Sequence, residues 1–276
     1  MILDTHQHFW NYESEKHSWV SDDMAVIRRD FLPQDLKPVY EQNGVKGCIA
    51  VQADQSLDEN TFLLSEAKNN KFIKGVIGWV DFQDIHIEET LQYYENEPLI
   101  KGYRHVVQAE ADPAFLLRKE FLRGIAKLEG RDLVYEILVF SHQLPAVLEF
   151  VKHFPNQQFQ IDHIAKPYIK EGYIDAWALL MKAIANYDNV SCKISGMITE
   201  ADFKNWKIEE LMPYMNVVLE AFGPKRIMYG SDWPVCLVAG SYPQVLNVAK
   251  HFSQQLSKEE QDDFFYRNAQ IMYNIK

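Results

Sequence analysis

The chain has 276 residues, of which 47% are hydrophobic and 24% charged, a balance that excludes a disordered chain. Its net charge of -11 and the lack of a lysine- or arginine-rich run exclude a basic nucleic-acid-binding surface. The start MILDTHQHFW is unlike a signal peptide, and no apolar run reaches the roughly 20 residues of a membrane span. Three scattered cysteines (Cys48, Cys192, Cys236) are typical of buried free thiols, so we expect a cytoplasmic protein that binds neither membrane nor nucleic acid.

Eight short apolar runs, rich in β-branched residues, alternate with amphipathic stretches of about 10 to 15 residues, which is the pattern of repeated strand–helix units. The predicted strands span residues 2–9, 47–52, 72–80, 100–106, 133–139, 158–164, 189–195 and 226–232. Runs such as GCIAVQ and IKGVIGWV are apolar at consecutive positions, as expected for strands that are covered on both faces.

Helix starts are marked by recognisable caps. Ser56 with Glu59 and Ser257 with Glu260 fit the capping box, in which hydroxyl and carboxylate bind free amides reciprocally. Asp112 and Pro113 predict the start of one further helix, which we expect to end at Gly130.

The number of strands favours one closed (β/α)8 barrel of the TIM type, formed as a single domain by residues 1–276. An open doubly wound sheet would give a similar pattern. However, no glycine-rich phosphate loop follows the first predicted strand, and polar residues stand at the carboxyl ends of many strands, where barrel enzymes keep their active sites. No linker or internal repeat divides the chain.

Three of these strand ends carry residues suited to catalysis. His6 and His8 are two positions apart, so a strand directs both imidazoles to one face. His163 lies at the end of the sixth strand in FQIDHIAKP, and Asp232 at the end of the eighth in RIMYGSDWP. Each feature alone is common in ordinary barrels, but a closed barrel would bring all four residues to one rim.

The chain resembles the amidohydrolase superfamily, within it the branch of sugar lactonases. The resemblance covers nearly the whole chain in order: DTHQHFW, KGYRHVVQ, VYEILV, DHIAKP, CKISG and YGSDWPV. It implies that Asp232 is the general base that takes a proton from water attacking a lactone carbonyl, with His6, His8 and His163 polarising the carbonyl oxygen.

Other residues near the predicted mouth are candidates for binding the substrate. Arg104 and Lys166 would contact sugar oxygens or the developing charge, and Trp10 and Trp233 would form apolar walls. His142 and His105 are weaker candidates. Lys193 is weaker still, because an alternating strand also lets it face away from the mouth and into solvent.

Many members of the superfamily bind one or two metal ions, but this chain departs from their ligand pattern. Its fourth strand offers Arg104 and His105 instead of a bridging lysine, and its fifth offers Tyr135 and Glu136 instead of a histidine. Two cations would therefore lack ligands. We favour catalysis without a cofactor. The alternative is one divalent cation, zinc by preference, held by four residues with Glu136 as an additional candidate: His6, His8, His163 and Asp232.

The function expected from this resemblance is hydrolysis of an aldono-1,4-lactone, such as an L-fucono- or L-rhamnono-lactone, to the aldonic acid. The small sugar lactone is then the partner, and the sequence leaves homo-oligomer formation open. Three alternatives remain: a metal-dependent hydrolase of another small ester or amide, a decarboxylase of the same superfamily, and a barrel that binds a metabolite without catalysis.

Overall fold

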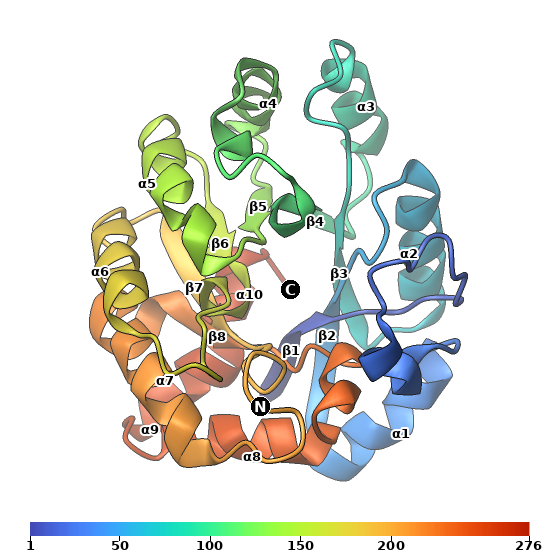
Figure 1. Ribbon diagram of the computed structural model, residues 1–276. Helices are drawn as coiled ribbons and strands as arrows, with labels where there is room; N and C mark the ends of the chain where they lie inside the picture. Colours follow the sequence, from blue (N-terminus) through green and yellow to red (C-terminus); the bar gives the residue numbers. More distant parts are fainter. Residues whose placement is uncertain (276) are drawn as a thin grey trace.

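Eight parallel strands form the centre of the structure, a computed structural model that describes residues 1–275. Their order in the sheet follows the chain from β1 to β8. The strands are β1 (Ile2–Gln7), β2 (Val45–Val51), β3 (Ile73–Gly78), β4 (Ile100–His105), β5 (Val134–Ile137), β6 (Phe159–Ile161), β7 (Val190–Ile194) and β8 (Ile227–Tyr229). Viewed along its axis in Figure 1, the sheet is surrounded by helices.

The seam between β8 and β1 closes this sheet into a barrel. The amide of Asp232 donates to the His6 carbonyl and the amide of His8 to the Trp233 carbonyl, each over 2.7 Å. The Thr5 hydroxyl adds a hydrogen bond of 2.7 Å to the Tyr229 carbonyl. The expected (β/α)8 barrel is therefore confirmed. The hydrogen bonds that join β8 to β1 involve His6, His8 and Asp232, which stand at the mouth of the barrel.

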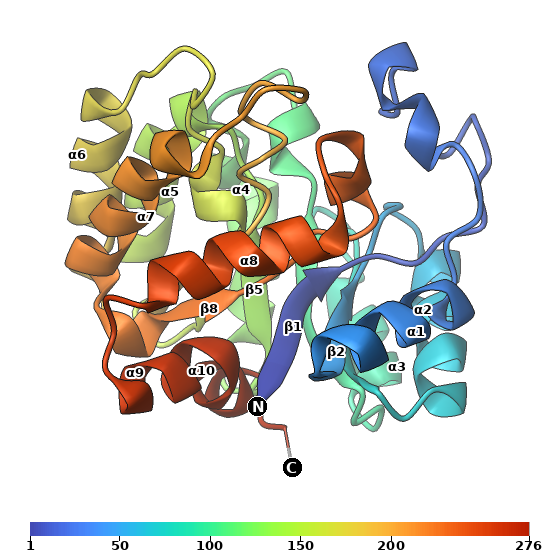
Figure 2. The same cartoon turned by 90° about the horizontal axis from the view of Figure 1, so that it is seen from below.

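Helices follow the strands and cover the outside of the barrel (Figures 1 and 2). They are α1 (Pro33–Asn43), α2 (Leu57–Asn69), α3 (Ile87–Tyr94), α4 (Lys119–Ile125), α5 (Leu144–Lys152), α6 (Asp175–Ile184), α7 (Ile208–Phe222) and α8 (Tyr242–Ser253), followed by the short α9 (Lys258–Asp262) and α10 (Asn268–Met272). Among residues 1–275, no helix is long and apolar enough to cross a membrane.

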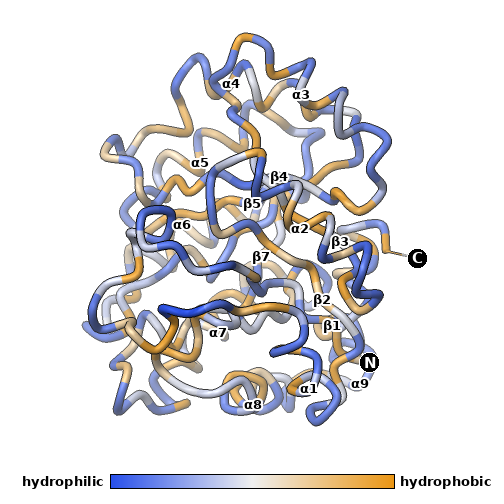
Figure 3. Tube along the Cα trace, turned by 90° about the vertical axis from the view of Figure 1, so that its right-hand side faces the viewer, coloured by the Kyte–Doolittle hydropathy of each residue, from blue (hydrophilic) through white to orange (hydrophobic). Residues whose placement is uncertain are grey.

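Strand side chains are buried on both faces, as the sequence predicted. In β2, Cys48 and Ala50 pack outward with the helices, whereas Ile49 and Val51 belong to a separate cluster inside the barrel. That inner cluster includes Leu3 and Met228 and is completed by residues of the C-terminal segment: Ala269, Tyr273 and Ile275. In Figure 3 the hydrophobic stretches run along the central strands and the hydrophilic ones along peripheral loops. The amino end of the barrel is thus filled with apolar side chains, and the carboxyl end is left for the site.

Three local predictions need correction. At one end or the other, the predicted strands extend up to three residues beyond the observed ones, chiefly because β6 and β8 end before the polar residues His163 and Asp232, whereas β2 begins two residues earlier than predicted. Ser257 and Glu260 form the expected capping box, but Glu59 binds the amide of Ala53 instead of completing a box with Ser56. The helix expected between Pro113 and Gly130 is broken into a 3-10 turn, α4 and a second 3-10 turn.

Candidate active site

A β-bulge places His6 inside the barrel. In β1, Asp4 stands opposite Cys48 of β2 but Gln7 stands opposite Ala50, so β1 contains one extra residue at this point. Leu3 and His6, three positions apart, therefore both face the barrel interior, where simple alternation would send them to opposite faces. His8 follows the strand end, and its ring centroid lies 4.9 Å from that of His6.

A left-handed turn after β6 brings a second imidazole to the same place. Four consecutive residues without a glycine have positive φ, namely His163 (52°), Ile164 (48°), Ala165 (57°) and Lys166 (45°). Each costs on the order of 1 kcal/mol relative to ordinary backbone. The turn directs both Asp162 and His163 inward, although neighbouring residues of a strand would face opposite sides. Backbone strain of this kind concentrates at functional sites.

Glycines make room for these imidazoles. A Cβ atom added to Gly196 would lie 2.5 Å from His163 Nδ1, and one added to Gly230 would lie 2.7 Å from His6 Cβ. The Ser195 hydroxyl lies 2.9 Å from His163 Nδ1 and fixes that ring. The segments CKISG and YGSDW therefore contribute open space as well as functional groups.

Asp232 stands at the centre of the cluster, with φ of 59°. Its Oδ1 atom lies 3.3 Å from His8 Nε2 and 3.9 Å from the Nε2 atoms of both His6 and His163. Burial acts to raise the pKa of Asp232, but attraction by His163 and His8 outweighs it and holds the pKa below its ordinary value. Burial lowers the pKa of His6 and of His163. Asp232 is therefore ionised at neutral pH.

The hydrogen-bond partners of His8 determine which nitrogen carries its proton. Its Nδ1 atom lies 2.8 Å from the Val51 carbonyl, which can only accept, so Nδ1 must donate. Its Nε2 atom lies 3.3 Å from Oδ1 of the Asp232 carboxylate. At this distance a proton or a cation must lie between the two groups.

Below the mouth lies a buried group of charged residues. Arg104 Nη1 donates to Asp162 Oδ2 over 3.0 Å and to His6 Nε2 over 3.2 Å. Lys193 Nζ lies 2.6 Å from Glu136 Oε1 and 3.1 Å from Asp162 Oδ1. Burial acts to raise the pKa of Asp162, but the charges of Lys193 and Arg104 hold it well below its usual range. Lys193 is completely buried here, so the expectation that it faces solvent is wrong.

A cavity of about 670 Å³ opens above Asp232. Arg104, His163 and Lys166 line it, and the Nε atom of the buried Arg104 has no hydrogen-bond partner among the described residues. Its walls combine apolar and polar side chains: Trp19, Met24, Leu138, Phe140, Phe203 and Val235 on one hand, Lys16, Asp54, Gln55, Gln108, Thr199 and Glu200 on the other. The volume suits a small organic molecule.

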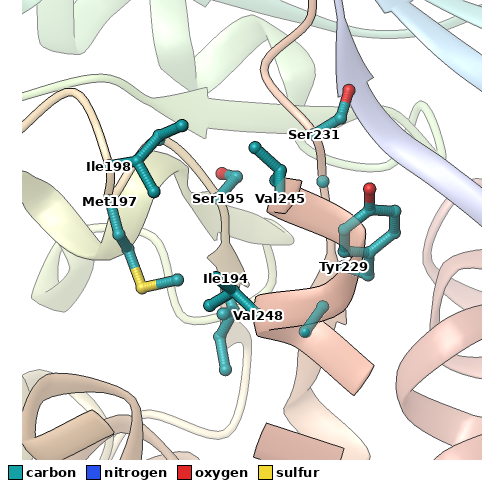
Figure 4. Close-up of a pocket in the computed structure, with 11 residues that line it drawn as sticks. Ile194, Ser195, Met197, Ile198, Tyr229, Ser231, Val245 and Val248 are labelled. Atoms are coloured by element: carbon teal, nitrogen blue, oxygen red, sulfur yellow. The ribbon is translucent and has the colours of Figure 1, made fainter. Parts of the chain in front are cut away.

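A second space, between β7, β8 and α8, holds about 10 Å³ and is too small for a substrate. Ser195, Tyr229 and Val245 are among its lining residues, as Figure 4 shows. The cavity above Asp232 is the candidate site because His8, His163 and Asp232 line it.

Several predicted substrate contacts lie elsewhere. Trp10 and Trp233 are buried in the outer core beside the mouth and do not line the cavity, whereas Trp19 does. His142 is exposed and stacks on Phe140. Lys166 reaches the cavity but pairs with Glu200 over 3.1 Å.

Two further predicted residues also lie away from the mouth. His105 points outward, where its ring stacks on Phe115. Glu136 is displaced from Asp232 toward the barrel interior, where it contacts Tyr273 and Lys193.

The donor atoms at the mouth fit a divalent cation. His6, His8 and Asp232 each offer one ligand atom, and these atoms lie within 4.8 Å of one another. Nitrogen and carboxylate ligands of this kind suit zinc and similar ions. His163 Nε2, at 3.9 Å from Asp232 Oδ1, lies beside the group. The three donor atoms of His6, His8 and Asp232 are the observation that fits a cation at this position.

Sequence reasoning missed Asp162, Gln52 and Ser195. Asp162 directly precedes His163, but strand alternation assigns these neighbours to opposite faces. Gln52 accepts from Arg104 Nη2 through its carbonyl over 2.5 Å and through its side chain over 3.1 Å. Its position at the carboxyl end of β2 was the one available signal.

Fold and site together define a (β/α)8-barrel enzyme with a histidine, histidine and aspartate cluster at its mouth. Residues 3–275 match the amidohydrolase family. The chain belongs to that family, which confirms the resemblance noted in the sequence and the expectation of a hydrolase.

Two relatives from Burkholderia bear the name L-fucono-1,5-lactonase. The protein of Burkholderia multivorans is 36% identical over 99% of this chain and 96% of its own length. The protein of Burkholderia ambifaria is 34% identical over 87% of this chain and 82% of its own length. A crystal structure of a Burkholderia multivorans amidohydrolase with bound zinc has a TM-score of 0.97 and 34% identity, and covers both chains completely.

Proposed function

We propose that this protein hydrolyses a small sugar lactone, by preference an L-aldono-1,5-lactone such as L-fucono-1,5-lactone, to the aldonic acid. The observation that carries the proposal is the ionised Asp232 at the floor of the cavity, within 3.9 Å of three imidazole nitrogens. The names of the two Burkholderia relatives support the class of substrate.

The cavity walls suit a sugar ring. Trp19, Met24 and Phe140 offer apolar surface to the ring faces, and side chains such as Gln108 and Asp54 can bind hydroxyl groups. The Oε1 atom of Gln108 is buried and has no partner within residues 1–275.

Asp232 acts as the general base in this reaction. It takes a proton from a water molecule as the water oxygen forms a bond to the lactone carbonyl carbon. The bond between that carbon and the ring oxygen then breaks, and protonated Asp232 returns the proton to the ring oxygen, which becomes the hydroxyl group of the product. Proton and charge therefore balance over the two steps.

Arg104 supports the negative charge that develops on the carbonyl oxygen. Arg104 is one of the residues that line the cavity, and its charge is fixed. His6 and His8 are less suited to this role, because Lys193 Nζ and Arg104 Nη1 lie 3.2 Å from the two ring nitrogens of His6 and the Val51 carbonyl lies 2.8 Å from His8 Nδ1. This assignment replaces the expectation that the imidazoles polarise the carbonyl.

His6, His8 and Asp232 would hold a divalent cation, zinc by preference, which when bound would polarise a carbonyl and lower the pKa of water. We propose that the reaction proceeds without it. Arg104 already supplies a positive charge, and its Nη1 atom competes for the lone pair of His6 Nε2 at 3.2 Å.

The size of the lactone ring is the point on which sequence and relatives differ. The sequence analysis led to an aldono-1,4-lactone, whereas both Burkholderia names specify a 1,5-lactone. We therefore propose the 1,5 ring as the better substrate.

A panel of lactones tests this function directly. L-Fucono, L-rhamnono, galactono and arabinono lactones are supplied in both ring sizes, and acid release is followed with a pH indicator. We expect the highest kcat/KM for an L-sugar 1,5-lactone. Turnover of no lactone, together with carbon dioxide release from hydroxylated aromatic acids, would instead identify a decarboxylase.

A further inference from the structure

We propose that Glu200 selects uncharged substrates: by pairing with Lys166 it keeps the cavity from binding carboxylates, so that neutral lactones enter and the anionic product leaves. Both side chains line the cavity above Asp232, and Lys166 Nζ lies 3.1 Å from Glu200 Oε1. The inference rests on the proposed function and deepens it, because it separates neutral lactones from lactones that carry an acid group.

Three lysine or arginine side chains line the cavity, and within residues 1–275 each of them has a carboxylate beside it. Lys16 Nζ lies 2.6 Å from Glu13 Oε1, and Arg104 Nη1 lies 3.0 Å from Asp162 Oδ2. The third is Lys166, which the carboxylate described above neutralises. A carboxylate on a substrate would therefore compete with an existing anion at each of these cations.

The acidic side chains of the cavity wall oppose an anion as well. Asp54, Glu200 and Asp232 all line the cavity, and Asp232 is ionised at neutral pH. Like charges brought together at a binding site are unfavourable and act against the wrong ligand. The charges around this cavity thus suit a neutral molecule better than an acid.

The exposure of the two lysine pairs shows which of them matters more. The side chains of Lys166 and Glu200 are 17% and 20% exposed, whereas those of Lys16 and Glu13 are 50% and 56% exposed. Solvent and salt screen the exposed pair strongly and the sheltered pair less. Without Glu200, Lys166 would therefore attract an anion more strongly than Lys16.

The backbone holds the pair of Lys166 and Glu200 together before a substrate enters. Lys166 ends the left-handed turn after β6, where its amide donates to the His163 carbonyl over 2.9 Å. Glu200 lies in the segment after β7, and its amide donates to the Met197 carbonyl over 3.1 Å. The Lys170 amide donates to the Glu200 carbonyl over 3.1 Å and so joins the two segments.

A neutralised lysine remains useful to a neutral sugar. The ammonium group of Lys166 has three protons, of which Glu200 engages one, and the carboxylate of Glu200 has further lone pairs. The pair can therefore donate to one hydroxyl group and accept from another. An ion pair that is only partly buried contributes little to stability, so stability gives no reason to place it on strained backbone.

The reaction itself changes the charge of the molecule in the cavity. A neutral lactone becomes an aldonic acid, which loses a proton at neutral pH and is released as a carboxylate. An unpaired Lys166 would retain this anion and slow the next turnover. Glu200 removes that attraction, so one side chain serves both selection of the substrate and release of the product.

Two lactones of the same configuration test the selection. L-Galactono-1,4-lactone is uncharged, and L-galactaro-1,4-lactone has a carboxylate in place of the primary hydroxyl group. In Glu200→Gln, we expect the kcat/KM of the anionic lactone divided by that of the neutral one to rise about tenfold or more, mainly through a lower KM for the anion. Binding of L-fuconate, measured by calorimetry on protein of known metal content, should also tighten about tenfold.

Two further variants show whether the effect acts through Lys166. Glu200→Asp keeps the charge and should return the ratio to within about threefold of the original. Glu200→Gln combined with Lys166→Met removes one charge of each sign and should abolish the gain in L-fuconate binding. The matched control is Glu97→Gln. The side chain of Glu97 is 19% exposed and pairs with Lys68 over 2.6 Å at the amino end of the barrel, so its loss should change neither measurement.

An unchanged ratio together with unchanged L-fuconate binding in Glu200→Gln would overturn the proposal. So would a double variant that binds L-fuconate as tightly as Glu200→Gln does. Calorimetry requires no turnover. A protein that hydrolyses no lactone, but whose Glu200→Gln variant gains affinity for L-fuconate, would therefore contradict the proposed function and leave the role of Glu200 intact.

Discussion

The two ends of the barrel interior are built from opposite kinds of residue. At the amino end, Leu3, Ile49, Ile77 and Met228 pack with the C-terminal segment into an apolar cluster. At the carboxyl end, the residues directed inward are histidines, carboxylates and buried cations, some on left-handed backbone. The comparison indicates that the apolar amino end stabilises the fold. The carboxyl end holds strained and charged groups, which lower that stability, in the positions that the site requires.

Among the changes proposed here, Asp232→Asn should have the largest effect, and the effect should be on catalysis at the carboxyl end of the barrel. The amide cannot accept a proton from water, so we expect kcat for the best lactone to fall about 10³-fold. Thermal stability should change little, because the variant removes one buried charge without creating a cavity. The control is Asp58→Asn, an exposed carboxylate in the first turn of α2, which should keep full activity. Full turnover by Asp232→Asn would show that another group is the base.

The opposite result is expected at the amino end. Met228→Ala removes a buried side chain from the apolar cluster and should lower the free energy of unfolding by about 2–4 kcal/mol. Urea denaturation measures this change. The kcat of the folded variant should stay within about twofold of the original, and a loss comparable to that of Asp232→Asn would argue against the division of roles between the two ends.

The amino-acid sequence was sufficient for the fold because periodicity and two-sided burial are local signals. It also singled out His6, His8, His163 and Asp232, which the structure brings to one rim. These residues could be found because they stand at strand ends, and in a closed barrel the strand ends converge.

Side-chain direction could not be predicted where the backbone departs from alternation. The bulge in β1 and the left-handed turn after β6 each reverse the expected face, so Asp162 was missed. Lys193 was assigned to solvent because its buried partners, Glu136 and Asp162, come from other strands. Trp19 was missed as a wall residue because it lies in the segment between β1 and α1, where no periodic pattern applies.

A smaller effect is expected from the pH dependence of stability near the mouth. Burial raises the pKa of Glu59 to about 7 although the Ala53 amide donates to it. The folded protein then keeps this proton between about pH 4.5 and 7 while the unfolded chain releases it, so stability should fall as pH rises through that window. Because Glu59 is partly exposed, we expect a contribution of about 1–2 kcal/mol. Glu59→Gln should flatten this part of the profile in urea denaturation at pH 5, 6 and 7, and an unchanged slope would assign the dependence to other groups.

The smallest effect is expected from removing metal. The fixed charge of Arg104 stands beside His6 Nε2 and lines the cavity, so it weakens cation binding and can itself support the developing negative charge. After exhaustive chelation, we expect the initial rate on the best lactone to change less than about threefold, with metal content measured on the same sample. Adding zinc should then change the rate of the original protein little, but Arg104→Gln should bind zinc more tightly in a competition assay with a fluorescent chelator. Complete loss of activity that only zinc restores would mean that catalysis depends on a bound cation and not on the charge of Arg104 in β4.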